Sequence, residues 1–481
     1  MKKIKNFIDG QFLEPSKNKY LENICPFNGK PYSMVPDSDN DDVESAVQSA
    51  HKASIKWAKE KVSTRSEVLK KMASLIRKRT EELARAETID NGKPLKISRA
   101  VDIPRSALNF EFFAENISFL NGQFFPMDDL AFNYTLRHPL GVVACISPWN
   151  LPLYLLTWKI APALATGNTV VAKPSEMTPM TAFLLGEIAQ EAGLPPGVLN
   201  IVHGTGEKVG SPLVSHNLIK GISFTGSTQT GKLIAEKSAS SFKKVSLEMG
   251  GKNPNIIFAD CDFEKAVETT LRSSFENQGQ ICLCGSRIFV EEPIYEKFKK
   301  ALLEKISTLT VGDPLKEETD LGSIVSASHH NKIKSYIKMA QEEKGQILCG
   351  GTEPSLDPSL KDGYFLNPTL VENLSPFCRT NQEEIFGPIA TLTPFKTEEE
   401  VTEWANSTPY GLAGSLWTKD LDRAHRMARN INSGILWVNC WMIRDLRTPF
   451  GGMKQSGLGK EGGLYALKFF TEEKNVCIKM N

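Results

Sequence analysis

Two short segments carry the residue types best suited to chemistry. One runs from Glu276 to Cys282 and sets the cysteine in a small polar turn with Asn277 and Gly279. The other lies upstream and sets Glu248 between an apolar run and a Gly-Gly pair. A thiolate is a strong nucleophile, and a nearby carboxylate can activate the thiol or the water that later releases the product. Cys282 and Glu248 are therefore candidates for a nucleophile and a base. On the residues alone, a small buried cysteine and an exposed strand-end carboxylate are the alternatives.

A second cysteine in the same turn, Cys284, raises the question of a bound metal. The C-x-C pair could supply two ligands, but no second Cys or His pair in the sequence has ligand spacing. We therefore expect no metal, and a structural or redox-protective role for Cys284. The adjacent pair His329-His330 predicts a solvated helix start.

Length and composition exclude several classes of protein. A chain of 481 residues is too long for one hydrophobic core, so two or three domains are expected. The formal net charge of +1 argues against a nucleic-acid or membrane surface as the main partner. The basic start is not followed by an apolar signal core, and no apolar run is long enough to cross a bilayer. Nine scattered cysteines, an odd number, indicate reduced thiols and a cytoplasmic protein.

Apolar strands alternate with helices through the first half of the chain. Two helices are expected at about 41–60 and 65–91, after an Asp-Gly hairpin at 7–12. Five buried strands are then expected at 141–147, 169–172, 198–202, 222–225 and 245–248. This alternation predicts an α/β fold with a doubly wound parallel sheet, which binds ligands at the carboxyl ends of its strands. The second half repeats the rhythm, with extended segments expected at 385–394, 414–417 and 474–480.

One glycine-rich turn nearly fits a phosphate-binding loop. The segment from Gly226 to Leu233 has the pattern G-x-x-x-x-G-K, but Leu233 stands where a magnesium-binding hydroxyl would be needed. This departure argues against an ATPase, although the turn still offers a helix N-terminus to an anion. Gly204, Gly206 and Gly210 form only a weak dinucleotide fingerprint, because the third glycine comes one place late.

Together these segments resemble the aldehyde dehydrogenase superfamily over nearly the whole chain. The resemblance implies that Cys282 is the nucleophile and that Glu248 is the general base for the hydrolytic water. It also implies that Asn150 and the Cys282 backbone N–H form an oxyanion hole. Members that release the acyl group to coenzyme A usually lack the glutamate present here as Glu248.

The same resemblance implies a three-part architecture. The expected parts are a dinucleotide-binding domain (1–120 and 141–250), an α/β catalytic domain (251–450) and a small β oligomerisation arm (121–140 and 462–481). We therefore expect a homo-oligomer, either a dimer or a tetramer.

The expected cofactor is NAD. Lys173 and Glu176 end a strand, which by itself fits a solvated strand end, but their family counterparts contact the adenine ribose. A carboxylate there would repel a 2′-phosphate and favour NAD over NADP. Family counterparts of Glu384 and Phe386 hold the nicotinamide ribose and pack beside the nicotinamide. The expected cofactor contacts are Ser147, Trp149, Lys173, Ser175, Glu176, Gly206, Gly210, Phe224, Gly226, Ser227, Glu384 and Phe386.

A substrate signal lies before the Pro-Phe-Gly-Gly run. Arg444, together with Arg105 and Trp158, resembles the branch that oxidises 2-aminomuconate and 2-hydroxymuconate 6-semialdehydes. Arginine is suited to bidentate carboxylate capture, so a carboxylate-bearing aldehyde is expected. The alternative is surface arginines that pair with Asp445 or Glu111, and the sequence leaves open whether Arg447 joins the site.

The sequence leaves two other functions as alternatives. One is a dehydrogenase of broad specificity or of neutral aldehydes, which would leave the arginines without a role. The other is a binding protein built on an inactive scaffold. The second has no support in the sequence, because Cys282, Glu248, Asn150 and Lys173 are all present.

Overall fold

The computed structural model describes residues 1–480 of the chain. Its first large sheet has eight strands in the order β22-β12-β11-β8-β9-β10-β2-β3. The strands are β2 Asn6–Ile8, β3 Gln11–Leu13, β8 Val142–Ile146, β9 Thr169–Lys173, β10 Leu199–Ile201, β11 Ile219–Thr225, β12 Lys244–Glu248 and β22 Gly457–Leu458. The five from β12 to β10 in this order are parallel. Their carboxyl ends therefore meet at one edge of the sheet, as the sequence predicted.

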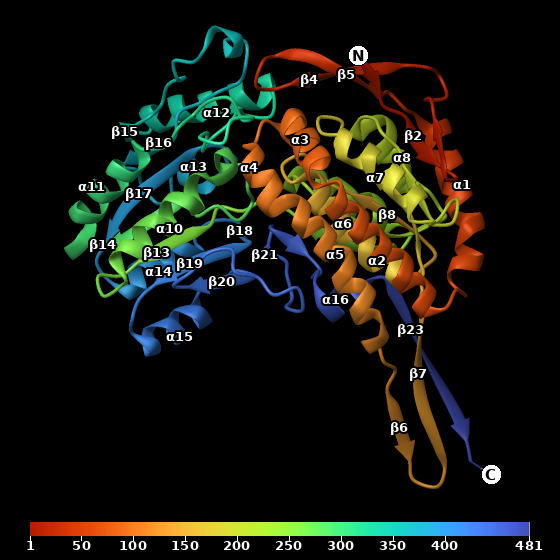
Figure 1. Ribbon diagram of the computed structural model, residues 1–481. Coiled ribbons are helices and arrows are strands. Elements are labelled where there is room, and N and C mark those ends of the chain that lie inside the picture. The colour runs from red at the N-terminus through yellow and green to blue at the C-terminus, as the bar shows by residue number, and fades with distance from the viewer. Residues whose placement is uncertain (481) are drawn as a thin grey trace.

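Helices cover both faces of this sheet (Figure 1). Alternate residues of β8 divide between two cores, with Val143 and Cys145 in one and Val142 and Ala144 in the other. The first core takes in α2 Val62–Lys78, α3 Thr80–Asn91, α5 Ile103–Asn116, α6 Pro152–Ala165 and α7 Met180–Glu191. The second takes in α1 Asn40–Trp57, α8 Ser211–Ser215 and α9 Thr228–Ala239. Both faces are thus buried, which confirms the doubly wound α/β class.

The second large sheet has seven strands in the order β15-β16-β17-β14-β13-β19-β20. Its strands are β13 Pro254–Ile257, β14 Arg287–Glu291, β15 Gln346–Cys349, β16 Thr369–Glu372, β17 Ile389–Phe395, β19 Ala413–Trp417 and β20 Ile435–Val438. Its helices are α10 Phe263–Phe275, α11 Tyr295–Ile306, α12 Ala327–Glu342, α13 Arg379–Gln382, α14 Glu398–Asn406 and α15 Leu421–Asn430.

A three-stranded antiparallel arm projects away from both sheets (Figure 1). It pairs β23 Thr471–Lys479 with β7 Ala131–Pro139, and β7 with β6 Phe124–Met127. A smaller sheet near the N-terminus joins β1 Lys2–Lys3, β4 Tyr20–Cys25 and β5 Lys30–Pro36. The remaining elements include α4 Leu95–Ile97, β18 Tyr410–Gly411, β21 Met453–Lys454 and α16 Gly463–Phe469. The expected domain boundaries stay a prediction.

Two expectations about elements were wrong. The helix expected at 65–91 is two helices, because Arg79 leaves the helical conformation and its guanidinium binds Glu82 and Glu187 at 2.7 and 2.6 Å. The strand expected from residue 385 begins at Ile389. The preceding residues leave the strand, since Phe386 has a φ of +64° and Pro388 has no N–H to donate, although the Pro388 carbonyl still accepts from the Thr369 N–H at 2.8 Å.

Within residues 1–480, no helix combines the length and the apolar character that a membrane crossing requires.

Candidate active site

The loop that carries Cys282 is held in an unusual backbone conformation. Asn277, Gln278 and Gly279 follow one another with φ values of 52°, 54° and 68°. The left-handed region costs a residue other than glycine about 1–2 kcal/mol, so tertiary contacts must hold the first two. The third position has no room for a side chain, because a Cβ on Gly279 would collide with the Gly387 carbonyl.

Hydrogen bonds from the first half of the chain fasten one side of this loop. The side-chain amide of Gln278 donates to the carbonyls of Gly92 and Ser323 at 3.1 and 3.0 Å. The Asn150 amide Nδ2 donates to the Gln280 carbonyl at 2.9 Å. The loop is therefore anchored to the end of α3 and to the segment that follows β8.

Asn253 fastens the other side of the loop. Its Nδ2 donates to the carbonyls of Cys282 and Cys284 at 2.8 and 2.9 Å, and its Oδ1 accepts from the Ala413 N–H at 3.0 Å. Because Asn253 precedes β13 and Ala413 begins β19, this contact ties the cysteine to the second sheet.

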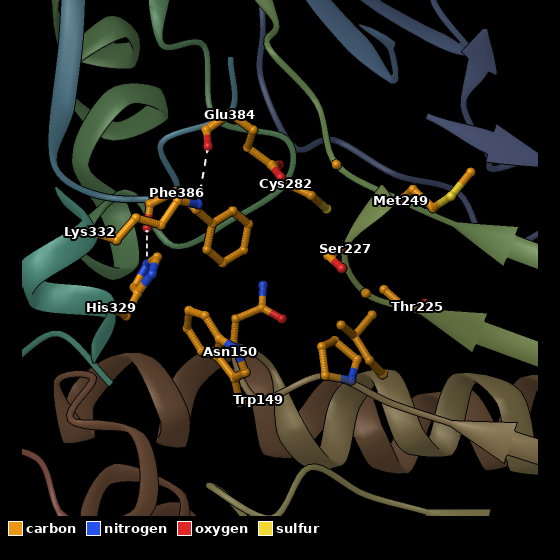
Figure 2. Close-up of a pocket in the computed structure, with 14 residues that line it drawn as sticks. Trp149, Asn150, Thr225, Ser227, Met249, Cys282, His329, Lys332, Glu384 and Phe386 are labelled. Atoms are coloured by element: carbon orange, nitrogen blue, oxygen red, sulfur yellow. Dashed lines mark hydrogen bonds between the residues drawn. The ribbon is translucent and has the colours of Figure 1, made fainter. Parts of the chain in front are cut away.

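Cys282 opens onto a cavity of ≈230 Å³ between the two halves (Figure 2). Seven of the expected site residues line it: Trp149, Asn150, Gly226, Ser227, Cys282, Glu384 and Phe386. The wall also contains Pro148, Leu155, Thr225, Met249, Gly250, His329 and Lys332. The other expected cofactor residues lie outside this cavity, on β9 and β11 and in the segments that follow β8, β9 and β10: Ser147, Lys173, Ser175, Glu176, Gly206, Gly210 and Phe224.

Asn150 is placed to act as a hydrogen-bond donor beside the thiol. Its side chain is buried and lines the cavity with Cys282. One N–H of the amide is used by the Gln280 carbonyl, which sets the orientation of the group. The second N–H of an NH₂ group is then free for an oxygen bound next to the sulfur.

Burial raises the pKa of the Cys282 thiol to about 12, and the charges of Glu384 and Glu248 add to the effect. The positive charge of Arg444 acts in the opposite direction. The thiol is thus mostly protonated at rest, and a nearby positive charge is what favours the reactive thiolate.

Glu248 is buried behind the cavity wall formed by Met249 and Gly250. Neither of its carboxyl oxygens has a hydrogen-bond partner within residues 1–480, and Oε1 packs against Gly451, where a Cβ would come within 2.6 Å. Burial, followed by the charge of Glu461, raises the pKa of Glu248 well above its ordinary value. Glu461 is itself held by Lys159 at 2.7 Å and Ser223 at 3.0 Å. This raised pKa favours the neutral form of Glu248, and only the ionised form can act as a base.

The cofactor side of the cavity combines a carboxylate with a helix N-terminus. Glu384 Oε1 accepts from the Gly251 N–H at 2.9 Å, and its side chain lies so close to Gly250 that a Cβ there would collide. The first turn of α9, capped by Ser227, opens at the end of β11. At the end of β8, the buried Ser147 hydroxyl has no partner among the described residues. An anion at the helix N-terminus and hydroxyl groups near Glu384 would fit these donors and acceptors, as a dinucleotide requires.

Two arginines meet at a wider opening of ≈570 Å³. The guanidinium of Arg105 lies 5.4 Å from the Trp158 ring centre, and that of Arg444 lies 5.8 Å from the same ring. Arg444 also lies 3.8 Å from the Phe450 ring and donates to the Tyr154 hydroxyl at 3.2 Å. Neither guanidinium forms an ion pair with a carboxylate in the part of the chain the structure describes, and Arg105 Nη2 is buried without a partner.

The alternative role, a surface arginine that pairs with a nearby carboxylate, applies to a different arginine. Arg447 is exposed and binds Asp445 at 2.5 Å, so it satisfies its charge locally. Glu111 binds Arg77 at 2.5 Å rather than Arg105. That alternative is therefore wrong for Arg105 and Arg444 and right for Arg447.

The expectation of a solvated histidine pair was also wrong. His330 is buried, and His329 lies in the cavity wall with its ring 5.2 Å from that of Trp149. Lys332, one turn further along α12, lines the same cavity. One signal in the sequence could have identified the side of α12 that faces the cavity. It is the i, i+3, i+7 spacing of His329, Lys332 and Tyr336, which places them on one helix face.

Comparisons with known proteins agree with this geometry. The model of the "Aldehyde dehydrogenase family" matches residues 12–476. A 2-aminomuconic semialdehyde dehydrogenase from Danio rerio is 49% identical over 99% of this chain and 98% of that protein. A 2-hydroxymuconic semialdehyde dehydrogenase from Pseudomonas sp. (strain CF600) is 45% identical over the full length of both. The solved NAD+ complex of an aldehyde dehydrogenase from Bacillus cereus is 37% identical, with a TM-score of 0.97 over 100% of this chain and 97% of that one.

Alkylation of Cys282 should report its protonation state. Because the thiol pKa is raised to about 12, the rate of reaction with iodoacetamide should keep rising with pH up to at least pH 9. Peptide mapping by mass spectrometry would follow Cys282 separately from the exposed Cys477. A rate that levels off near neutral pH would show that the thiolate is already formed at rest.

Proposed function

The chain belongs to the aldehyde dehydrogenase family, and we propose that it oxidises a short aldehyde with a carboxylate at its far end, using NAD. The best candidates are 2-aminomuconate 6-semialdehyde and 2-hydroxymuconate 6-semialdehyde, which correspond to the substrates named for its relatives.

The observation that carries this proposal is the pair of arginines around Trp158. Two like charges held near one ring, with no carboxylate to neutralise either, are costly unless an anion joins them. The lowered pKa of Arg105, due first to burial and also to the charge of Arg444, is consistent with that cost. A substrate carboxylate would supply the missing charge and accept hydrogen bonds from both groups.

In the proposed reaction, the Cys282 thiol loses its proton to solvent and Sγ forms a bond to the aldehyde carbon. The carbonyl π bond breaks, and the free N–H of Asn150 and the Cys282 backbone N–H bind the resulting oxyanion. A hydride then leaves this carbon, and bound NAD would supply the acceptor for it. The product on the enzyme is a thioester of Cys282. Glu248 then takes a proton from a water molecule, the water oxygen bonds to the acyl carbon, and the carbon–sulfur bond breaks to release the acid and the thiol.

The cofactor proposal also concerns the choice between NAD and NADP. Lys173 Nζ binds Glu176 Oε2 at 3.2 Å at the end of β9, which keeps the carboxylate at the sheet edge. If Glu176 meets the adenine ribose, a 2′-phosphate would face its negative charge. NAD should therefore be preferred.

A dehydrogenase of neutral aldehydes is the second candidate. The apolar surface of Trp158 and Phe450 favours it, since both could pack against an uncharged substrate. The two unpaired guanidiniums favour the carboxylate.

For the whole molecule we propose a homo-oligomer formed through the arm, which exposes Phe124 and Phe125. A reducing cytoplasm is supported by nine free cysteines.

Replacing Glu248 by Gln should slow the release of the acid more than the first hydride transfer. A first turnover of about one equivalent of NADH per site should persist, while steady-state turnover falls roughly a hundredfold or more. In the unaltered protein the raised pKa of Glu248 means that its basic form accumulates at higher pH than that of an ordinary carboxyl group, so the steady-state rate should rise with pH over that higher range. The Gln variant should lose this dependence. Rapid mixing over a pH series would measure both, and an equal loss of burst and steady state would mean that Glu248 activates the thiol.

Replacing Arg444 by Ala should raise KM for a carboxylate-bearing aldehyde by about ten- to a hundredfold. KM for a neutral aldehyde of similar length should change little. Because Arg444 also favours the Cys282 thiolate, a smaller fall in kcat is expected with both substrates. Arg447→Ala is the matched control and should leave both substrates unaffected, since Arg447 is paired with Asp445 at the surface. Equal increases of KM for the two substrates would contradict a carboxylate site.

Replacing Glu176 by Gln should narrow the preference for NAD over NADP by about tenfold, because one negative charge no longer faces the phosphate. The ratio of kcat/KM values for the two cofactors would measure it. An unaltered protein that used both equally well would show that Glu176 points elsewhere.

A further inference from the structure

One face of α12 binds a single short segment of the opposite wall. His329 Nε2 lies 2.7 Å from the Phe386 carbonyl oxygen, and Lys332 Nζ donates to the Glu384 carbonyl at 3.3 Å. One turn further on, the Tyr336 hydroxyl donates to Glu383 Oε2 at 2.7 Å. These three residues are spaced i, i+3 and i+7, so they project from the same side of the helix.

The position of His329 is fixed from both sides. It lies in the first turn of α12, where its backbone N–H donates to the Ser326 cap at 3.2 Å. Its ring packs 5.2 Å from Trp149 and 6.2 Å from Phe386, and those two rings lie 5.3 Å apart (Figure 2). Three aromatic rings thus form part of the wall of the cavity that Cys282 also lines.

The hydrogen-bonding role of His329 follows from its partner. A carbonyl oxygen only accepts, so Nε2 must carry the proton. Burial lowers the pKa of His329 to about 4, which leaves the ring neutral at neutral pH. Its single N–H is then committed to Phe386.

Phe386 needs such a contact. Its φ of +64° lies in the left-handed region, which disfavours a bulky residue and persists only where surrounding contacts hold it. Phe386 and Glu384 both face the cavity, so any change in this segment alters the surface that a ligand meets there.

We propose that His329 is a positioning residue for the cofactor, acting by holding the Phe386 backbone and thereby the Glu384–Phe386 side of the cavity. The proposal rests on the proposed use of NAD. Lys332 and Tyr336 extend the same attachment along α12. Loosening it should weaken NAD binding while the hydrogen bonds that fasten the cysteine loop, which come from other residues, are kept.

Three variants of His329 distinguish the effect of its hydrogen bond from the effect of its aromatic ring. His329→Gln keeps a donor at about the reach of Nε2, His329→Phe keeps a ring against Trp149, and His329→Ala keeps neither. The dissociation constant of NAD, measured by titration calorimetry without aldehyde, should rise about three- to tenfold for Phe and Ala. It should stay within about twofold of the unaltered protein for Gln. KM for NAD should follow the dissociation constant, whereas the alkylation rate of Cys282 should not change.

The neighbouring histidine is a matched control. His330 is also buried on α12 and bonds a backbone carbonyl, that of Phe365, at 3.2 Å, but it does not line the cavity. His330→Phe should leave NAD binding unchanged even if it lowers Tm. Tyr336→Phe removes one hydroxyl outside the cavity and should weaken NAD binding in the same direction as His329→Phe, by a smaller factor.

Three results would overturn the proposal: NAD binding by His329→Phe as tight as in the unaltered protein, equal losses in His329→Phe and His330→Phe, or a Gln variant as weak as Phe. If His329→Phe does not fold, an unchanged dissociation constant in Tyr336→Phe would also overturn it. Failure of the unaltered protein to bind NAD would instead refute the proposed cofactor.

Discussion

The hydrogen bonds that fasten the Cys282 loop between the two large sheets are the constraint on which the site depends. The loop contains two left-handed residues, Asn277 and Gln278, that would not hold this conformation alone. Contacts from α3 and the Asn150 segment hold one side, and Asn253 holds the other. As a consequence, the thiol and the Asn150 amide keep a fixed relation although they come from different halves of the chain. The conformation of the loop that carries Cys282 therefore depends on contacts from both halves of the chain.

Burial also influences which groups of the site are protonated before substrate binds. It raises the pKa of Cys282, Glu248 and Glu384, which favours the neutral form of each group. Arg105 and Arg444 remain charged and unpaired with any acid among residues 1–480. The site is therefore short of negative charge, which favours an anionic substrate. The same arginine that would bind the carboxylate also favours the thiolate, so recognition and reactivity are linked through Arg444.

Much of the fold could be predicted from local pattern, since a buried parallel strand between helices has a clear apolar signature. The five parallel strands of the first sheet have such patterns, whereas the roles of Cys282 and Asn150 were expected from the resemblance to a family. Features set by distant contacts could not be predicted in this way. Arg79, at the break between α2 and α3, pairs with the distant Glu187, and the carbonyl of the left-handed Phe386 is bonded by His329, a residue the sequence suggested to be solvated. The arginine site could be predicted only in part. The sequence indicated Arg444 and Arg105, but it could not exclude that they pair with Asp445 or Glu111.

The central claim is that the substrate is held at both ends, by Cys282 at one and by Arg105 and Arg444 at the other. The most direct measurement is a crystal structure of the protein with a six-carbon dienoic dicarboxylate, which matches the expected acid product. The account predicts one carboxylate between the two guanidiniums, beside the Trp158 ring, and the other carboxylate next to Cys282 Sγ and the Asn150 amide. A dicarboxylate bound in the cavity with neither end at Arg105 or Arg444 would contradict it.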